Sequence, residues 1–82
     1  MKQFEIWWAE LREPGGRRPV LLLSRHDAYG YLSKFIAAEV TSNIRQIASE
    51  VPLGEDEGLP KPCVANCDNL REIGRASCRE RV

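Results

Sequence analysis

The stretch that decides the fold is residues 16–24, "GRRPVLLLS". The run from Pro19 to Leu23 is short and unbroken in its apolar character, which is typical of a strand covered on both faces. The preceding Pro14-Gly15-Gly16 cannot continue a strand and indicates a flexible loop. The stretch therefore predicts a central strand that the chain enters from a loop through Arg17 and Arg18.

The segment before this loop predicts a neighbouring strand. Residues 2–11, "KQFEIWWAEL", alternate in polarity, with Phe4, Ile6 and Trp8 on one predicted face and Gln3, Glu5, Trp7 and Ala9 on the other. Trp7 stands on the polar face, where it is either half covered by a neighbouring loop or available as a stacking surface.

Three further segments have the composition of strands. They are residues 35–41 ("FIAAEVT"), 50–53 ("EVPL") and 63–70 ("CVANCDNL"). The proline within 50–53 favours an edge position, because proline cannot donate to a sheet ladder. Five short strands joined by long loops predict a mainly β fold, a small antiparallel barrel.

Composition bounds the class of protein. The chain has 82 residues, enough for one small domain, with 43% hydrophobic and 29% charged residues, as in soluble globular proteins. Net charge is zero, so an anion-binding site has to be local. The N-terminus lacks the apolar core of a signal peptide, and no run is long enough to span a membrane. We interpret the three cysteines as reduced thiols of a cytoplasmic protein.

Two residues stand where a phosphate could be bound. Arg18 directly precedes a buried strand, which fixes its position, and its planar guanidinium suits a phosphate; the alternative is an ordinary solvated loop arginine. Thr41 ends a predicted strand, so its hydroxyl either donates to a phosphate oxygen or makes a local turn with its own backbone. Residue chemistry alone thus predicts a small β-barrel with an anion site, and neither a metal nor a cofactor.

Three stretches in order extend this interpretation. "FEIWWAEL" (4–11), "GRRPVLLLS" (16–24) and "EVTSNIRQIASEVPLGEDEGLPKPCVANCDNL" (39–70) resemble the MazF/PemK family of toxin endoribonucleases. The resemblance implies an SH3-like barrel with a C-terminal helix, acting as a homodimer. It implies metal-independent cleavage of single-stranded RNA (mRNA), in which the ribose 2′-hydroxyl attacks the adjacent phosphate. It also implies a MazE-like antitoxin as partner and a cytoplasmic location.

The resemblance assigns roles to residues of this chain. The key arginine and threonine of the family fall on Arg18 and Thr41, which we therefore expect to be catalytic. The residues expected to contact RNA or the antitoxin are Arg17, Ser42, Arg45 and, by stacking on a base, Trp7.

Two other functions stay open. One is a gyrase-poisoning toxin of the related CcdB type, and the other is a non-catalytic SH3-like binding module. The pairing of Arg18 with Thr41 favours the nuclease.

The C-terminal residues 72–82, "EIGRASCRERV", are small and charged, and they resemble the translation of a common sequencing-library adapter. We therefore expect a C-terminally truncated toxin domain, residues 1–71, followed by an artefactual tail that is disordered or opportunistically packed. Such a barrel lacks its last strand and C-terminal helix. Because an open sheet edge exposes backbone donors and apolar surface, we expect this fragment to be insoluble or inactive.

Overall fold

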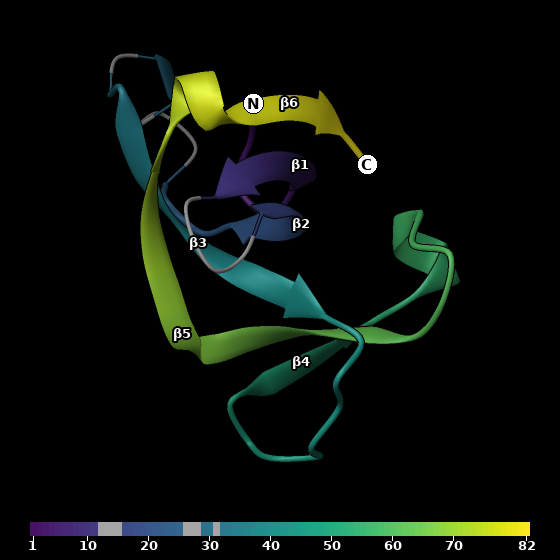
Figure 1. Cartoon of the computed structure of the whole chain (residues 1–82). Coiled ribbons are helices and arrows are strands. Elements are labelled where there is room, and N and C mark those ends of the chain that lie inside the picture. Colours follow the sequence, from purple (N-terminus) through teal and green to yellow (C-terminus); the bar gives the residue numbers. More distant parts are fainter. Residues whose placement is uncertain (12–15, 26–28, 31) are drawn as a thin grey trace.

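The computed structural model describes residues 1–11, 16–25, 29–30 and 32–82 and is drawn in Figure 1. Within these residues the chain forms one six-stranded antiparallel sheet in the order β4-β5-β3-β2-β1-β6, and no α-helix. The predicted mainly β, antiparallel architecture is confirmed. The described residues contain no helix that is long and apolar enough to cross a membrane. The strands are β1 (Ile6–Leu11), β2 (Gly16–Leu22), β3 (Lys34–Thr41), β4 (Glu50–Leu53), β5 (Cys63–Gly74) and β6 (Cys78–Arg81), with short 3-10 turns η2 (Glu55–Glu57) and η3 (Arg75–Ser77).

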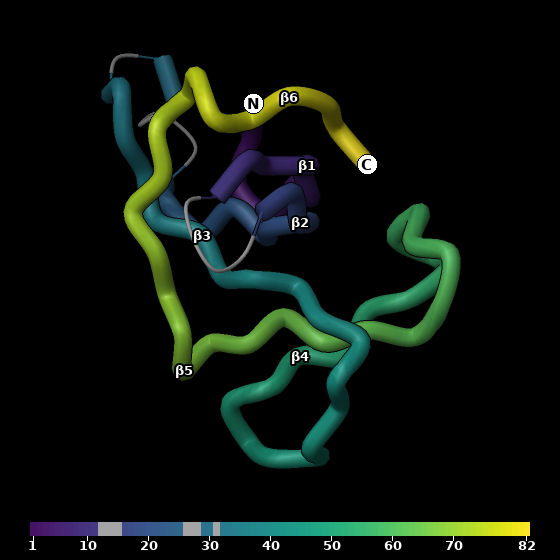
Figure 2. Tube along the Cα trace, in the orientation of Figure 1, coloured from purple at the N-terminus to yellow at the C-terminus, as the bar shows by residue number. Residues whose placement is uncertain are grey.

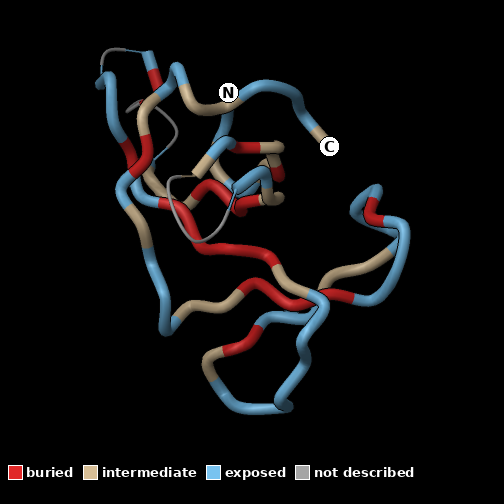
Figure 3. The backbone as a smooth tube through the Cα atoms, in the orientation of Figure 1, coloured by how far each residue is buried: buried red, intermediate tan, exposed pale blue. Residues whose placement is uncertain are grey.

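The central strands β2 and β3 are covered on both faces, as residues 16–24 predict. Leu21 belongs to a first core cluster, whereas Val20 and Leu22, its neighbours in sequence, belong to a second one. Figure 3 shows the buried stretches running along β2, β3 and parts of β5. The first cluster consists of Ile6, Leu21, Ala38, Val40, Leu59, Cys63 and Ala65, and the second of Ala9, Val20, Leu22, Tyr29, Phe35, Ala37 and Ile73.

The edge and the loops lie where the sequence predicts them. β4 pairs with β5 alone and so forms one edge of the sheet, and residues 42–49 form a loop. The interpretation of Pro14-Gly15 as part of a loop falls outside the described residues.

The prediction for the first strand is wrong in two details. Phe4 does not share a buried face with Ile6: its φ is 71° and its side chain is 65% exposed. A turn, in which the Glu5 amide donates to the Lys2 carbonyl at 3.2 Å, precedes the strand and delays its start to Ile6. Ala9, expected on the polar face, is fully buried in the second cluster, because both faces of this curved sheet carry a core.

The C-terminal residues form strand structure. β5 continues past Leu70 to Gly74, and β6 then pairs antiparallel with β1, with a register shift between Trp8 and Ala9. Figure 2 shows this last segment lying beside β1. The Val82 amide donates to the Ile6 carbonyl at 2.8 Å, and the Val82 side chain packs against the first cluster. We expected an open sheet edge, but residues 78–82 occupy the edge at β1. Of the two arrangements expected for the tail, disordered or packed, the structure has the packed one.

Candidate functional site

Arg18 and Thr41 come together at the end of the sheet where β2 begins and β3 ends. The antiparallel register pairs Val20 with Glu39 and Leu21 with Ala38, and continuing it by two residues brings Arg18 opposite Thr41. The pair lines two adjoining cavities, which places both side chains in the wall between them. The sequence-predicted pair is therefore one site in space.

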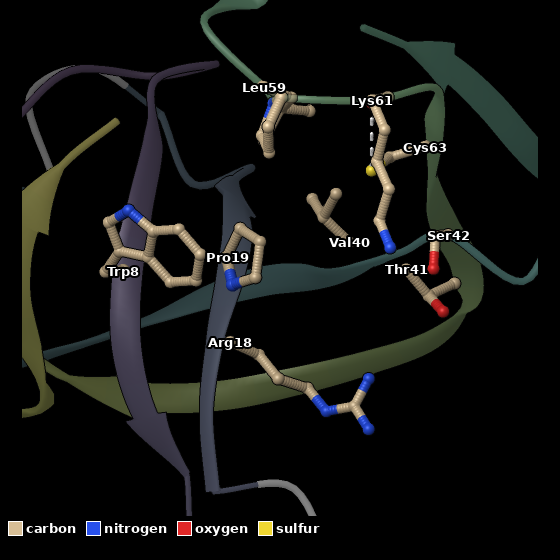
Figure 4. Close-up of a pocket in the computed structure, with 10 residues that line it drawn as sticks. Trp8, Arg18, Pro19, Val40, Thr41, Ser42, Leu59, Lys61 and Cys63 are labelled. Carbon is tan, nitrogen blue, oxygen red and sulfur yellow. Dashed lines mark hydrogen bonds between the residues drawn. The ribbon is translucent and has the colours of Figure 1, made fainter.

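The two cavities differ in chemistry. The first, here called the apolar cavity, has a volume of about 210 Å³ and is drawn in Figure 4. The second, called the amide cavity, has a volume of about 250 Å³. The apolar cavity is lined by Trp8, Arg18, Pro19, Val40, Thr41, Ser42, Leu59, Pro60, Lys61 and Cys63, and the amide cavity by Arg18, Glu39, Thr41, Asn43, Arg45, Asn66 and Asn69.

Thr41 makes the local turn that the sequence left open, and keeps a proton to donate. Its Oγ1 accepts a hydrogen bond from the Asn43 backbone amide at 3.1 Å. A hydroxyl has two acceptor positions and one donor, so this bond fixes the oxygen without using the hydroxyl proton. Ser42 follows in the apolar cavity. The turn therefore holds the Thr41 hydroxyl in place between the two cavities.

Arg45 is held at the amide cavity by a buried carboxylate on β4. The Glu50 side chain is only 2% exposed. Its Oε1 accepts hydrogen bonds from the backbone amides of Arg45 (2.9 Å) and Gln46 (3.0 Å). Its Oε2 accepts Arg45 Nε at 3.0 Å. Burial alone would raise the pKa of the Glu50 carboxyl, but these hydrogen bonds and the Arg45 charge outweigh burial and lower the pKa. The Gln46 φ of 58° completes this tight turn, which positions Arg45.

A second buried carboxylate, that of Glu39, lines the amide cavity. Glu39 Oε2 accepts hydrogen bonds from Asn69 Nδ2 at 3.3 Å and from Arg71 Nε. The β3–β5 register jumps from Ala38↔Leu70 to Glu39↔Asn66, which leaves residues 67–69 as a bulge. Bulges redirect side chains next to functional sites, and this one brings Asn69 to Glu39.

Trp8, and not Trp7, belongs to the site. Trp7 pairs with Val20, packs against the second cluster and donates its Nε1 to Glu5 Oε1 at 3.0 Å. Trp8 pairs with Pro19 and lines the apolar cavity, with the Arg17 guanidinium 5.0 Å from its ring centroid. Two adjacent residues of a strand face opposite ways, and only Trp8 points to the cavity.

The site also contains residues that sequence reasoning missed. Lys61 extends toward Ser42 and Thr41 in Figure 4. Asn43, Asn66 and Asn69 come from a loop and from β5. Glu39 could have been found from the sequence, because it is a charged residue within the mostly apolar strand segment "FIAAEVT". Trp8, like Lys61, was not predicted as a site residue, and both line the apolar cavity.

The arrangement suits a phosphodiester chain with bases on either side. Three cations, Arg18, Arg45 and Lys61, line the two cavities, and the carboxylate of Glu39 is paired with Arg71. Guanidinium and hydroxyl donors side by side can bind phosphate oxygens. In the part of the chain that the structure describes, no group of three or more His, Cys, Asp or Glu side chains is arranged to hold a metal ion.

The comparisons with known proteins agree with one another on the family that this chain resembles. The family model described as "PemK-like, MazF-like toxin of type II toxin-antitoxin system" matches residues 2–82. The chain is similar to a probable endoribonuclease MazF2 of Mycobacterium tuberculosis, with 34% identity covering 100% of this chain and 79% of the relative. The solved structure of Mycobacterium tuberculosis toxin MazF-mt6 superposes with a TM-score of 0.88 at 32% identity, covering 95% of this chain and 76% of that one. A MazE–MazF structure from Deinococcus radiodurans gives a TM-score of 0.76 at 29% identity, covering 99% and 75%.

Proposed function

Because the chain belongs to the PemK-like, MazF-like toxin family of type II toxin–antitoxin systems, we propose that it is an endoribonuclease that cleaves single-stranded RNA without a metal ion. The observation that carries the proposal is the position of Arg18 and Thr41, which line the same two cavities. A gyrase poison or a plain binding module has no need of a phosphate-binding pair between two base-sized cavities.

The reaction that fits these groups is an internal transesterification. The ribose 2′-oxygen forms a bond to the adjacent phosphorus, the bond from phosphorus to the 5′-oxygen breaks, and the products are a cyclic phosphate and a free 5′-hydroxyl. The 2′-hydroxyl loses a proton and the leaving 5′-oxygen gains one. Arg18 stabilises the negative charge that develops on the pentacovalent phosphate, since its high pKa suits an electrostatic role better than proton transfer. Thr41 donates a hydrogen bond to a phosphate oxygen.

The same surface supports a proposal for the partner. The similar Deinococcus radiodurans structure is a MazE–MazF complex. Arg17, Arg18 and Arg45 present positive charge around the two cavities, as needed for an acidic antitoxin segment that competes with RNA. We further propose that the chain works as a homodimer in the cytoplasm, where mRNA is available.

The test is a cleavage assay with single-stranded RNA in the presence of a chelator. We expect products with a cyclic phosphate and a 5′-hydroxyl, and no cleavage when the scissile nucleotide is 2′-deoxy. Arg18→Ala is expected to slow cleavage by about 100- to 1000-fold. Arg79→Ala, an exposed arginine on β6, is the matched control and leaves the rate unchanged. RNA that stays intact with the native sequence overturns the proposal; arrested replication would then favour the gyrase poison, and RNA binding alone the module.

A further inference from the structure

The mechanism leaves one buried charge without a task. Glu39 lies between Ala38 and Val40 on the central strand β3 and is itself only 9% exposed. Glutamate is rarely buried, because a carboxylate loses its hydration there, and an aliphatic residue would suit the strand better. Arg71 compensates the charge. The carboxylate opens onto the amide cavity, beside Arg18 and Thr41, which is where a ligand would meet it.

Glu39 sets the orientation of the Asn69 amide. An ionised carboxylate only accepts hydrogen bonds, so the Asn69 amide has to turn its Nδ2 toward Glu39, as the 3.3 Å bond shows. The carbonyl Oδ1 of Asn69 is then directed away from Glu39. An asparagine without such a neighbour can present either end of its amide to a ligand. Because Asn69 itself lines the amide cavity, this carbonyl is the end of the amide that a ligand there would meet.

The carboxylate keeps acceptor capacity of its own. A carboxylate can accept about four hydrogen bonds, and those that the described residues Asn69 and Arg71 donate both go to Oε2. The wall of the amide cavity thus offers two neighbouring acceptors, Glu39 and the Asn69 carbonyl. A volume of about 250 Å³ leaves room for one nucleobase. Two neighbouring acceptors match the amino group of adenine, cytosine or guanine, whereas uracil presents a single N3–H donor flanked by two carbonyl oxygens, which two acceptors would repel.

We propose that Glu39 is a specificity-determining residue, which makes the amide cavity a subsite for a base that bears an exocyclic amino group and disfavours uracil there. The inference rests on the proposed function, since it places this base next to the cleaved bond. Glu39 acts partly by direct contact with the base and partly by positioning Asn69.

The experiment first locates the preferred site of the wild-type chain in a pool of random-sequence RNA, from the cleavage products or, where there are none, from the RNAs that the chain retains. Short RNAs then carry each of the four bases at the nucleotides flanking that site, with a 2′-deoxy sugar at the scissile position, so that binding is measured without cleavage. At one flanking position we expect amino-bearing bases to bind more tightly than uracil by between about 5- and 150-fold. In Glu39→Gln, which adds a donor and frees the Asn69 amide to turn over, the difference falls to about 3-fold or less. Glu72→Gln, an exposed carboxylate outside the amide cavity, keeps the wild-type preference.

A second variant covers the case in which Glu39→Gln does not fold. Asn69 is exposed, so Asn69→Ala removes the oriented carbonyl without disturbing the core, and we expect it to weaken the same preference. If the wild-type chain cleaves RNA and both variants keep its base preference, the inference fails and the proposed function stands. If the wild type does not cleave but binds the 2′-deoxy RNAs with the predicted preference, the proposed function fails and the subsite stands. RNAs that bind without any difference between bases overturn the subsite alone, and a chain that neither cleaves nor binds RNA overturns both.

Discussion

The two ends of one face of β3 differ sharply. At one end Phe35 and Ala37 are buried in the second cluster, with Tyr29 packed edge-on against Phe35 at a ring-centroid distance of 4.9 Å. At the other end the same face carries Glu39 and Thr41, which open onto the amide cavity. Alternate residues of a strand share a face, so the difference arises from the surroundings of the two ends and not from the direction of the side chains.

The hydrogen-bonded neighbour of β3 is β5 at both ends. Beside Phe35 it pairs regularly and buries Ile73, whereas opposite Glu39 its register jumps and residues 67–69 bulge out. A single strand thus closes the core at one end and leaves a polar cavity at the other. Such a division predicts that substitutions at the closed end change stability, whereas those at the open end change activity and base preference.

The largest effect is expected at the closed end, for Phe35→Ala. Phe35 is almost fully buried, so its removal leaves a cavity and should lower the free energy of unfolding by about 3–5 kcal/mol. That is a large part of the stability expected for a domain of this size. Chemical denaturation followed by tryptophan fluorescence measures it. The matched control is Ile36→Ala on the opposite face of the same strand, where the side chain is 39% exposed; an equal loss for both variants would contradict the comparison.

At the open end, Thr41→Val keeps the shape of the side chain and removes the hydroxyl. We expect RNA cleavage to slow by about 100- to 1000-fold, because one donor to the phosphate is lost. The bond from the Asn43 amide is lost too, so the free energy of unfolding should fall by only about 1 kcal/mol. Single-turnover cleavage and denaturation of the same sample separate the two quantities. A Thr41→Ser variant that stays as slow as Thr41→Val would remove the hydroxyl from the mechanism.

Residues 72–82 raise a separate question, that of their origin. The string resembles translated adapter sequence, yet the family model matches through residue 82. We propose that these residues are foreign to the domain and pack onto it opportunistically. Three of the four residues of β6 are exposed, which fits a strand that adds little to the core. A genomic copy of the gene with this ending intact would refute the proposal.

A substitution of Ile73 tests whether this segment packs into the second cluster in solution. Ile73 is 6% exposed within the second cluster, so Ile73→Val should lower the free energy of unfolding by about 0.5–1.5 kcal/mol. The same denaturation measurement applies, with Ala76→Gly in the exposed turn as a control for changes in the segment itself. No change for Ile73→Val would show that the segment is loose. The proposed activity and these predictions require a chain that folds, and a chain without a cooperative unfolding transition would instead bear out the expectation from the sequence that it is insoluble or inactive.

The central strand and the Arg18–Thr41 pair can be predicted from the sequence. The other features of the site depend on how the strands pair. The apolar run at 19–23 predicts a central strand, and the family resemblance points to Arg18 and Thr41. Which of two adjacent tryptophans meets the site depends on the phase of β1 against β2, which the alternation alone does not fix. The contact of Glu39 with Asn69 depends on a bulge thirty residues along the chain. Composition carries no signal for that bulge.

Acid should weaken the loop that holds Arg45 at the open end. The lowered pKa of Glu50 means that its ionised form is favoured in the folded chain. The sign follows from linkage: this contribution is complete above the usual glutamate pKa of 4.5 and is lost as the pH falls through the lower, folded value. Thermal melting between pH 3 and 7 should show a fall in the wild type below about pH 5 that is smaller in Glu50→Gln. Identical pH profiles for the two proteins would exclude this role for Glu50.

The smallest effect is expected at β6, the edge strand beyond β1. Arg79 Nη2 contacts Glu10 Oε2 at 3.0 Å, but the two side chains are 57% and 56% exposed. Water and salt screen such a pair, so Arg79→Ala should change the free energy of unfolding by about 0.2–1 kcal/mol at low salt and less at 1 M salt. Denaturation at the two salt concentrations measures it, with Glu10→Gln as the partner variant. A loss as large as that of Phe35→Ala, unaffected by salt, would mean that β6 helps to hold the closed end and is not a peripheral strand.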